Sequence, residues 1–186
     1  MAKTILISGT WGLESDLWWK VASPFWQTAK HRGLDLAAPD DPFTWTTALE
    51  GVKGDNREWI VAASALRWFC KAKGIEKPNI VAHSHGGQLP LLATEHGLEI
   101  GTLVTVATPV RDDVLGHLVG RRIHRWVHIH TGAGDRMQLL GELGDGEISA
   151  RRKMPGAENI YEPDQTHSGL LDADLWTARR WWELLK

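Results

Sequence analysis

Short apolar runs alternate along this chain with longer segments of helical periodicity. The apolar runs lie at residues 4–8, 34–38, 79–83, 102–107, 126–131 and 159–162. Several are apolar throughout, which is typical of parallel strands covered on both faces. The helical segments lie at residues 14–32, 57–73, 87–96, 112–122 and 170–185. The alternation predicts an α/β fold, with about six mostly parallel strands flanked by helices on both faces.

The chain offers room for one domain. It has 186 residues and contains neither an internal repeat nor a linker rich in proline and serine. Six strands and five helices use most of that length. A single domain over residues 1–186, without a cap domain, is therefore expected.

Charge and composition exclude several classes of partner. The formal charge is −2, from 21 Lys+Arg against 23 Asp+Glu, so no electrostatic footprint for nucleic acid is present. No run of apolar residues is long enough for a membrane span, and the first one is too short for a signal peptide. The only cysteine, Cys70, cannot form an internal disulfide. A cytoplasmic protein with a small-molecule partner is expected, and no pattern predicts an oligomeric state.

The most specific motif is Ala82-His83-Ser84-His85-Gly86, in which an apolar strand runs directly into a serine. It matches the pattern G-x-S-x-G with alanine in the first position. At such a strand-to-helix turn the serine backbone is strained and its Oγ is exposed, and bulky residues two positions away would collide. The following helix N-terminus favours an oxyanion there. Ser84 is thus predicted to be a nucleophile; the alternative is a surface serine on a polar turn.

A serine hydroxyl is a weak nucleophile, so it needs a base, and the base needs an orienting acid. In this architecture the chain order is serine, acid, histidine. Asp135 follows the run at 126–131 on a glycine-rich turn, and His167 lies in a loop before the last helix. Both are expected to meet Ser84 at the carboxyl edge of the sheet.

Some residues allow competing interpretations. Asp112 and Asp113 follow the run at 102–107 and are rivals of Asp135, although they also suit the cap of the next helix. His83 and His85 look like a metal-binding pair, but no acidic residue or cysteine lies near them in the sequence. No phosphate-binding glycine motif is present. Neither a metal nor an organic cofactor is predicted.

These motifs resemble the α/β-hydrolase family, in particular its small lidless serine esterases and lipases. Residues 82–86 are similar to the Ala-x-Ser-x-Gly elbow of some bacterial lipases, and the resemblance implies a minimal α/β-hydrolase fold. It also implies an oxyanion hole formed by the backbone N–H groups of His85 and Thr10, with Trp11 as the alternative to Thr10. Pro90 departs from the family pattern and is expected to kink or delay the helix after the elbow.

Two of the 11 tryptophans, Trp11 and Trp45, fall in loops expected at the carboxyl edge. Their rings are predicted to form apolar walls that contact the substrate.

The combined features predict a serine hydrolase that cleaves carboxylic esters through an acyl-enzyme. An acyltransferase or thioesterase with the same triad is the alternative, as is a catalytically silent hydrolase fold that acts as a binding module. Without a cap, the site is expected to be open and to favour short or medium acyl chains.

Overall fold

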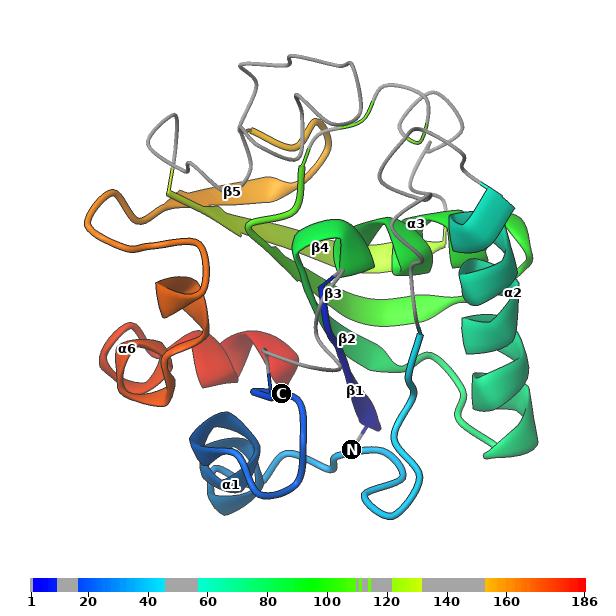
Figure 1. The fold of residues 1–186 in the computed structure, drawn as a ribbon, viewed down its shortest axis with the longest axis horizontal. Helices are drawn as coiled ribbons and strands as arrows, with labels where there is room; N and C mark the ends of the chain where they lie inside the picture. The colour runs from blue at the N-terminus through cyan, green and yellow to red at the C-terminus, as the bar shows by residue number, and fades with distance from the viewer. Residues whose placement is uncertain are drawn as a thin grey trace.

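A five-stranded sheet lies at the centre of the molecule, in the order β1-β2-β3-β4-β5 (Figure 1). The computed structural model describes residues 2–9, 17–45, 57–109, 111, 114, 122–131 and 153–186. The strands are β1 (Thr4–Ile7), β2 (Asn79–His83), β3 (Ile100–Val106), β4 (Ile123–His130) and β5 (Glu158–Tyr161). Every neighbouring pair is parallel, which confirms the predicted α/β class.

One of the six predicted strands, at residues 34–38, does not form. Leu36 forms only an isolated parallel bridge with Thr4, on the side of β1 away from β2. Ala38 then adopts a left-handed backbone, with φ at +43°. Because extended pairing cannot continue through that conformation, the segment stops after one bridge.

Helices and 3₁₀ turns cover the sheet. They are α1 (Pro24–His31), α2 (Arg57–Ala72), η2 (Ser84–Gly87), α3 (Gln88–Glu95), η4 (Gly169–Leu171), α6 (Ala173–Ala178) and η5 (Trp181–Leu185). The helices predicted at 57–73 and 87–96 are confirmed as α2 and α3. The helix predicted at 112–122 lies outside the described residues, apart from Val114 and Arg122.

The helix predicted at 14–32 begins later than expected. Residues 17–23 form turns, and α1 starts at Pro24, while residues 14–16 lie outside the described part of the chain. Ser23 is the N-cap, and its Oγ accepts a hydrogen bond from the backbone N–H of Trp26 at 3.0 Å. A serine cap followed by proline at the first helical position is a strong start signal.

The single helix predicted at 170–185 is wrong, since the segment is divided into η4, α6 and η5. Asp172 caps α6 by accepting the backbone N–H of Leu175 at 2.8 Å. Arg180 then takes a left-handed backbone, with φ at +58°, which ends α6. The break turns the last residues back onto the sheet, where the side chain of Asn79 donates to the carbonyl of Leu185 at 2.7 Å.

Pro90 delays α3 without kinking its middle. The 3₁₀ turn η2 comes first, α3 begins at Gln88, and Pro90 occupies the first turn of α3. Backbone N–H groups in a first turn have no acceptor within the helix, so the proline costs no helical hydrogen bond.

The two faces of the sheet are covered by different helices (Figure 1). The core on one face joins Ile5 and Ile7 of β1 to residues of α2 and α3. The core on the other face joins Leu6 to residues of α1, α6 and η5. On this second face, the ring of Phe25 lies with its centroid 4.9 Å from that of Trp176. No cap domain is present in the described residues, and none of their helices combines the length and apolar character needed to cross a bilayer.

The connections diverge at the carboxyl ends of β1 and β2. From β1 the chain runs through α1 to Leu36 at the outer edge, whereas from β2 it runs through α3 to β3 on the other side. In open α/β sheets, ligands bind in the crevice at such a reversal of direction. The residues that follow these two strands are Ser8 and Ser84, so the topology places a candidate site where they meet.

Candidate active site

Ser84 forms the turn from β2 into η2. Its φ is +53°, a left-handed conformation that costs a residue other than glycine about 1–2 kcal/mol. The turn leaves the serine half-buried. The strained elbow predicted from the sequence is confirmed by this backbone.

Close backbone contacts surround the elbow. A Cβ added to Gly86 would lie 2.0 Å from the carbonyl oxygen of Ser8, and one added to Gly87 would lie 2.1 Å from Oγ1 of Thr108. On the side of β1, a Cβ at Gly9 would lie 2.9 Å from Cβ of Ser84. Only glycine fits at 86 and 87, and the chain after β1 passes directly beside the serine.

His167 lies next to this elbow, in the loop between β5 and η4. The Nε2 of His83 is 3.2 Å from the backbone carbonyl oxygen of His167, and the centroids of the two rings are 4.7 Å apart. A carbonyl only accepts, so His83 carries the proton on Nε2 and donates it. The loop with the predicted base is thus fastened to the residue that precedes the predicted nucleophile.

The first residue of the same loop, Glu162, is held by an ion pair with Arg179. Glu162, whose side chain is only 7% exposed, accepts hydrogen bonds from Nε and Nη2 of Arg179 at 2.8 and 2.7 Å. This bidentate pairing raises the pKa of the Arg179 guanidinium. It connects the end of β5 to the residue that follows α6.

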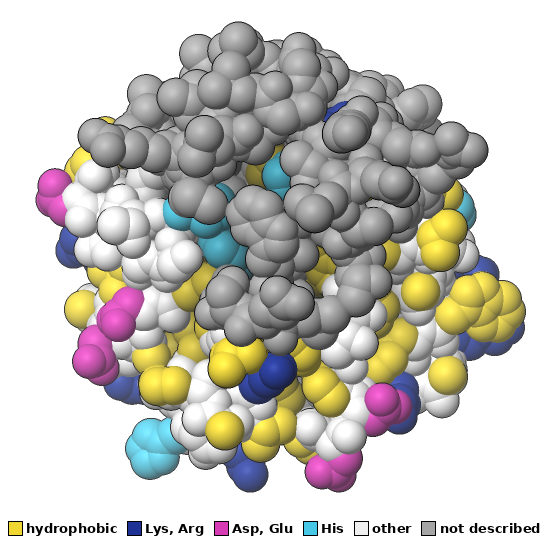
Figure 2. All heavy atoms as spheres, in the orientation of Figure 1, with side chains coloured by type: hydrophobic (Ala, Val, Ile, Leu, Met, Phe, Trp, Pro, Cys, Tyr) yellow, Lys and Arg dark blue, Asp and Glu magenta, His cyan; other side chains and the backbone are white. Residues whose placement is uncertain are grey.

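His83 and His85 face different partners. The ring of His83 contacts Trp18 edge-on, with the ring centroids 6.4 Å apart, while His85 stacks on Trp59 at 5.6 Å. Among the residues that the structure describes, no three His, Cys, Asp or Glu side chains are placed to hold a metal. Figure 2 shows histidine side chains near the middle of the face viewed. No pattern in the sequence indicates that His83 fastens the His167 loop, since that contact spans 84 positions.

Trp45 is a core residue in this structure. It is 7% exposed, and its Nε1 donates to the carbonyl oxygen of Ser8 at 2.9 Å. The same oxygen lies against Gly86, so the indole holds the end of β1 against the elbow. The role of Trp45 in substrate contact stays a prediction.

Other predicted site residues lie outside the described part of the chain. They are the triad acid Asp135 with its rivals Asp112 and Asp113, and the oxyanion-hole residue Thr10 with its alternative Trp11. Trp11 is also predicted to contact the substrate. Their roles stay predictions. His85 is described, and it occupies the second position of η2, at the helix end where N–H groups point outward.

Comparison with known proteins identifies the fold. No protein-family model matches the sequence, and no curated protein matches it significantly. Mature lipase BlEst2 of Bacillus licheniformis superposes with a TM-score of 0.57 at 16% identity, over 100% of this chain and 92% of that chain. A predicted CIB-like hydrolase from Thermoplasma acidophilum superposes with a TM-score of 0.63 at 14% identity. The match covers 99% of this chain and 86% of that chain. Dienelactone hydrolase from Anabaena variabilis superposes with a TM-score of 0.57 at 16% identity, and the match covers 98% of this chain and 86% of that chain.

The chain has an α/β-hydrolase fold. The resemblance seen in the sequence is therefore confirmed at the level of architecture. Sequence identities this low establish the fold and leave the activity to be argued from the site, because one fold hosts many functions. Within the α/β-hydrolase fold, Ser84 occupies the turn after the strand at the reversal of direction, as described above.

The strain at Ser84 can be measured. Glycine adopts a left-handed backbone freely, whereas alanine keeps the strain of the serine. The free energy of unfolding in urea is therefore expected to be about 1 kcal/mol higher for Ser84→Gly than for Ser84→Ala. This difference already allows for the greater conformational entropy of glycine in the unfolded chain, which opposes it. Equal stability of the two variants would show that the elbow is relaxed.

The bond between His83 and the His167 loop is also testable. His83→Phe keeps a ring but removes the donor, and one hydrogen bond is worth about 1 kcal/mol. Amide exchange in the peptide covering residues 163–168 is then expected to be roughly fivefold faster. His83→Gln retains a donor near the position of Nε2 and is the matched control. Unchanged exchange in His83→Phe would mean that the loop is held elsewhere.

Proposed function

We propose that this protein is a serine hydrolase that cleaves carboxylic esters of small molecules, with Ser84 as nucleophile and His167 as base. The observation that carries the proposal is the left-handed backbone of Ser84, with φ at +53°. Glycine would occupy this position without strain, so a serine there points to use of its side chain. The hydrolases among the structural neighbours support catalysis over a binding module.

The geometry supports a two-step mechanism. His167 removes the proton from Oγ of Ser84 as the oxygen attacks the ester carbonyl carbon. The tetrahedral intermediate collapses to an acyl-enzyme, and the alcohol leaves with the proton from His167. Water then attacks the acyl-enzyme with His167 again as base, which releases the acid and restores the serine.

Two backbone N–H groups would stabilise the negative oxygen of each tetrahedral intermediate. His85 is one donor, at the N-terminal end of η2, where the helix dipole favours negative charge. Thr10 is proposed as the second donor, with Trp11 as the alternative, because the backbone of Gly9 passes beside Ser84. Each such donor is worth about 3 kcal/mol in the transition state.

The acid of the triad is proposed to be Asp135. It follows β4, which lies between β3 and β5 in the sheet, and β5 leads into the His167 loop. A carboxylate there would hold His167 in the tautomer that accepts the serine proton. Asp112 and Asp113 follow β3 and remain the rival acids.

Removal of the nucleophile is the direct test. Ser84→Ala is expected to lower kcat/KM for nitrophenyl esters by about 10⁴-fold or more, because the triad acts as a unit. A fluorophosphonate probe is expected to label the native protein at Ser84 and to spare the variant. Ser64→Ala, on α2, is the matched control. Activity that survives Ser84→Ala would overturn the mechanism, whereas products acylated on an added alcohol or thiol would assign a transferase.

The only cysteine offers a second test. Cys70 is buried in α2, and desolvation raises its pKa to about 12, so the reactive thiolate is absent at neutral pH. Ester hydrolysis is therefore expected to persist through treatment of the folded protein with iodoacetamide, and to persist in Cys70→Ala. Loss of activity in step with alkylation of Cys70 would contradict a serine mechanism.

A further inference from the structure

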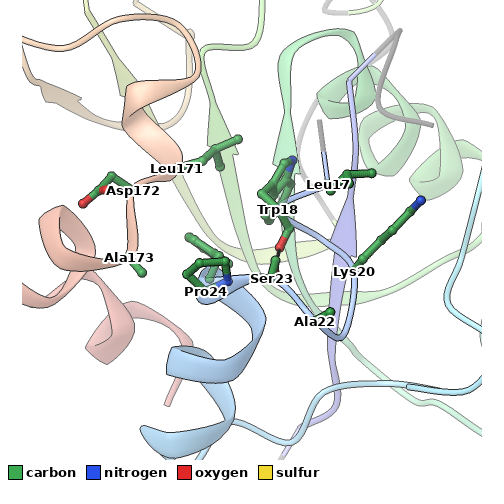
Figure 3. Close-up of a pocket in the computed structure, with 10 residues that line it drawn as sticks. Leu17, Trp18, Lys20, Ala22, Ser23, Pro24, Leu171, Asp172 and Ala173 are labelled. Carbon is green, nitrogen blue, oxygen red and sulfur yellow. Dashed lines mark hydrogen bonds between the residues drawn. The ribbon is translucent and has the colours of Figure 1, made fainter. Parts of the chain in front are cut away.

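A cavity of about 450 Å³ lies between the segment after β1 and the segment after β5 (Figure 3). Its volume falls within the usual range for small-molecule pockets. The described lining is mostly apolar and is made by Leu17, Trp18, Pro24, Phe25, Leu171 and Ala173. These side chains come from the turn before α1, from α1 itself, from η4 and from the start of α6, and Figure 3 shows the labelled ones around the cavity.

Two polar side chains in the lining, those of Ser23 and Asp172, hydrogen-bond to the protein backbone, whereas the indole Nε1 of Trp18 is buried without a hydrogen-bond partner among the described residues. Oγ of Ser23 accepts from the N–H of Trp26 and donates to the carbonyl of Trp18, and Oδ1 of Asp172 accepts from the N–H of Leu175. Nζ of Lys20 lies 5.5 Å from the ring centroid of Trp19. An occupant therefore meets mainly hydrocarbon surface, and the cavity suits an apolar chain better than a polar ligand.

Trp18 connects this cavity to the catalytic elbow. It lines the cavity and contacts the ring of His83 edge-on, with the centroids 6.4 Å apart. His83 precedes Ser84 in the chain and lies against the ring of His167. On the other wall, Leu171 belongs to the turn η4, which follows the His167 loop directly. The cavity is thus connected to the residues beside the proposed nucleophile and base through the rings of Trp18 and His83.

Resting on the proposed function, we infer that this cavity receives the acyl chain of the ester and that the substrates carry medium-length acyl chains. The acyl group stays bonded to Ser84 through both chemical steps, whereas the alcohol departs after the first. An apolar cavity beside the elbow therefore assists both steps only when it holds the acyl chain. Chain length is the property that such a cavity selects.

The dependence of kcat/KM on acyl length tests the inference. Burial of one methylene corresponds to about a fourfold gain, so kcat/KM is expected to rise by that factor per methylene from nitrophenyl acetate toward the octanoate until the cavity is filled. The matched arm holds the acyl group as acetyl and lengthens the alcohol, and it is expected to show no such rise. A rise in the alcohol arm alone would overturn the assignment.

A substitution at the rim links the effect to this cavity. Ala22 is exposed and lines the cavity, so Ala22→Phe is expected to fold and to place a ring in it. The variant should lose the gain in kcat/KM with acyl chain length. Ala65→Phe makes the same change at an exposed position of α2, on the opposite face, and is the control. Leu17→Ala trims a side chain that is 48% exposed and should reduce the gain per methylene.

The outcomes separate this inference from the proposed function. Esterase activity with the same length dependence in the native protein, Ala22→Phe and Leu17→Ala would overturn the cavity assignment and leave the hydrolase intact. If no ester is cleaved and Ser84 is not labelled, the proposed function fails. Calorimetric titration with 1-octanol then decides the cavity: binding that is lost in Ala22→Phe supports an apolar-chain site, and binding that is absent or unchanged overturns it.

Discussion

The close packing of the elbow backbone is the constraint on which the candidate site depends. Gly86 rests against the carbonyl of Ser8, and Gly87 rests against Thr108, at separations that leave no space for a side chain. These contacts hold Ser84 in a backbone that costs about 1–2 kcal/mol. The strain is offset by β2, which is buried along its whole length between β1 and β3.

The same packing connects the loops around the serine. The Ser8 carbonyl that touches Gly86 also accepts the indole N–H of Trp45, so one oxygen fastens two loops to the elbow. On the opposite side, His83 fastens the His167 loop through its Nε2. Because His83 belongs to β2 and precedes Ser84, the position of the proposed base is set by the strand that sets the nucleophile. Supporting contacts of this kind hold functional side chains in fixed positions relative to one another.

The aromatic core on the face of α1 gives the site its apolar side. Phe25 lies 4.7 Å from Trp182 and 5.0 Å from Trp18, measured between ring centroids. These contacts join α1 to the C-terminal helices and leave the cavity between them. The breaks at Asp172 and Arg180, which divide the final segment, allow these helices to return to the sheet. The cavity therefore results from the way in which α1 packs beside the C-terminal helices.

Features that local sterics control could be predicted without the structure. Short, largely apolar runs predicted all five strands, and small residues around Ser84 predicted a strained turn, because both depend on neighbours within a few positions. Other features depend on contacts between distant parts of the chain. Residues 34–38 make one bridge, the final segment is divided, and Trp45 is buried, since each outcome depends on contacts with distant parts of the chain. The bond from His83 to His167 joins residues 84 positions apart, and hydrophobic periodicity carries no information on pairing across such a separation.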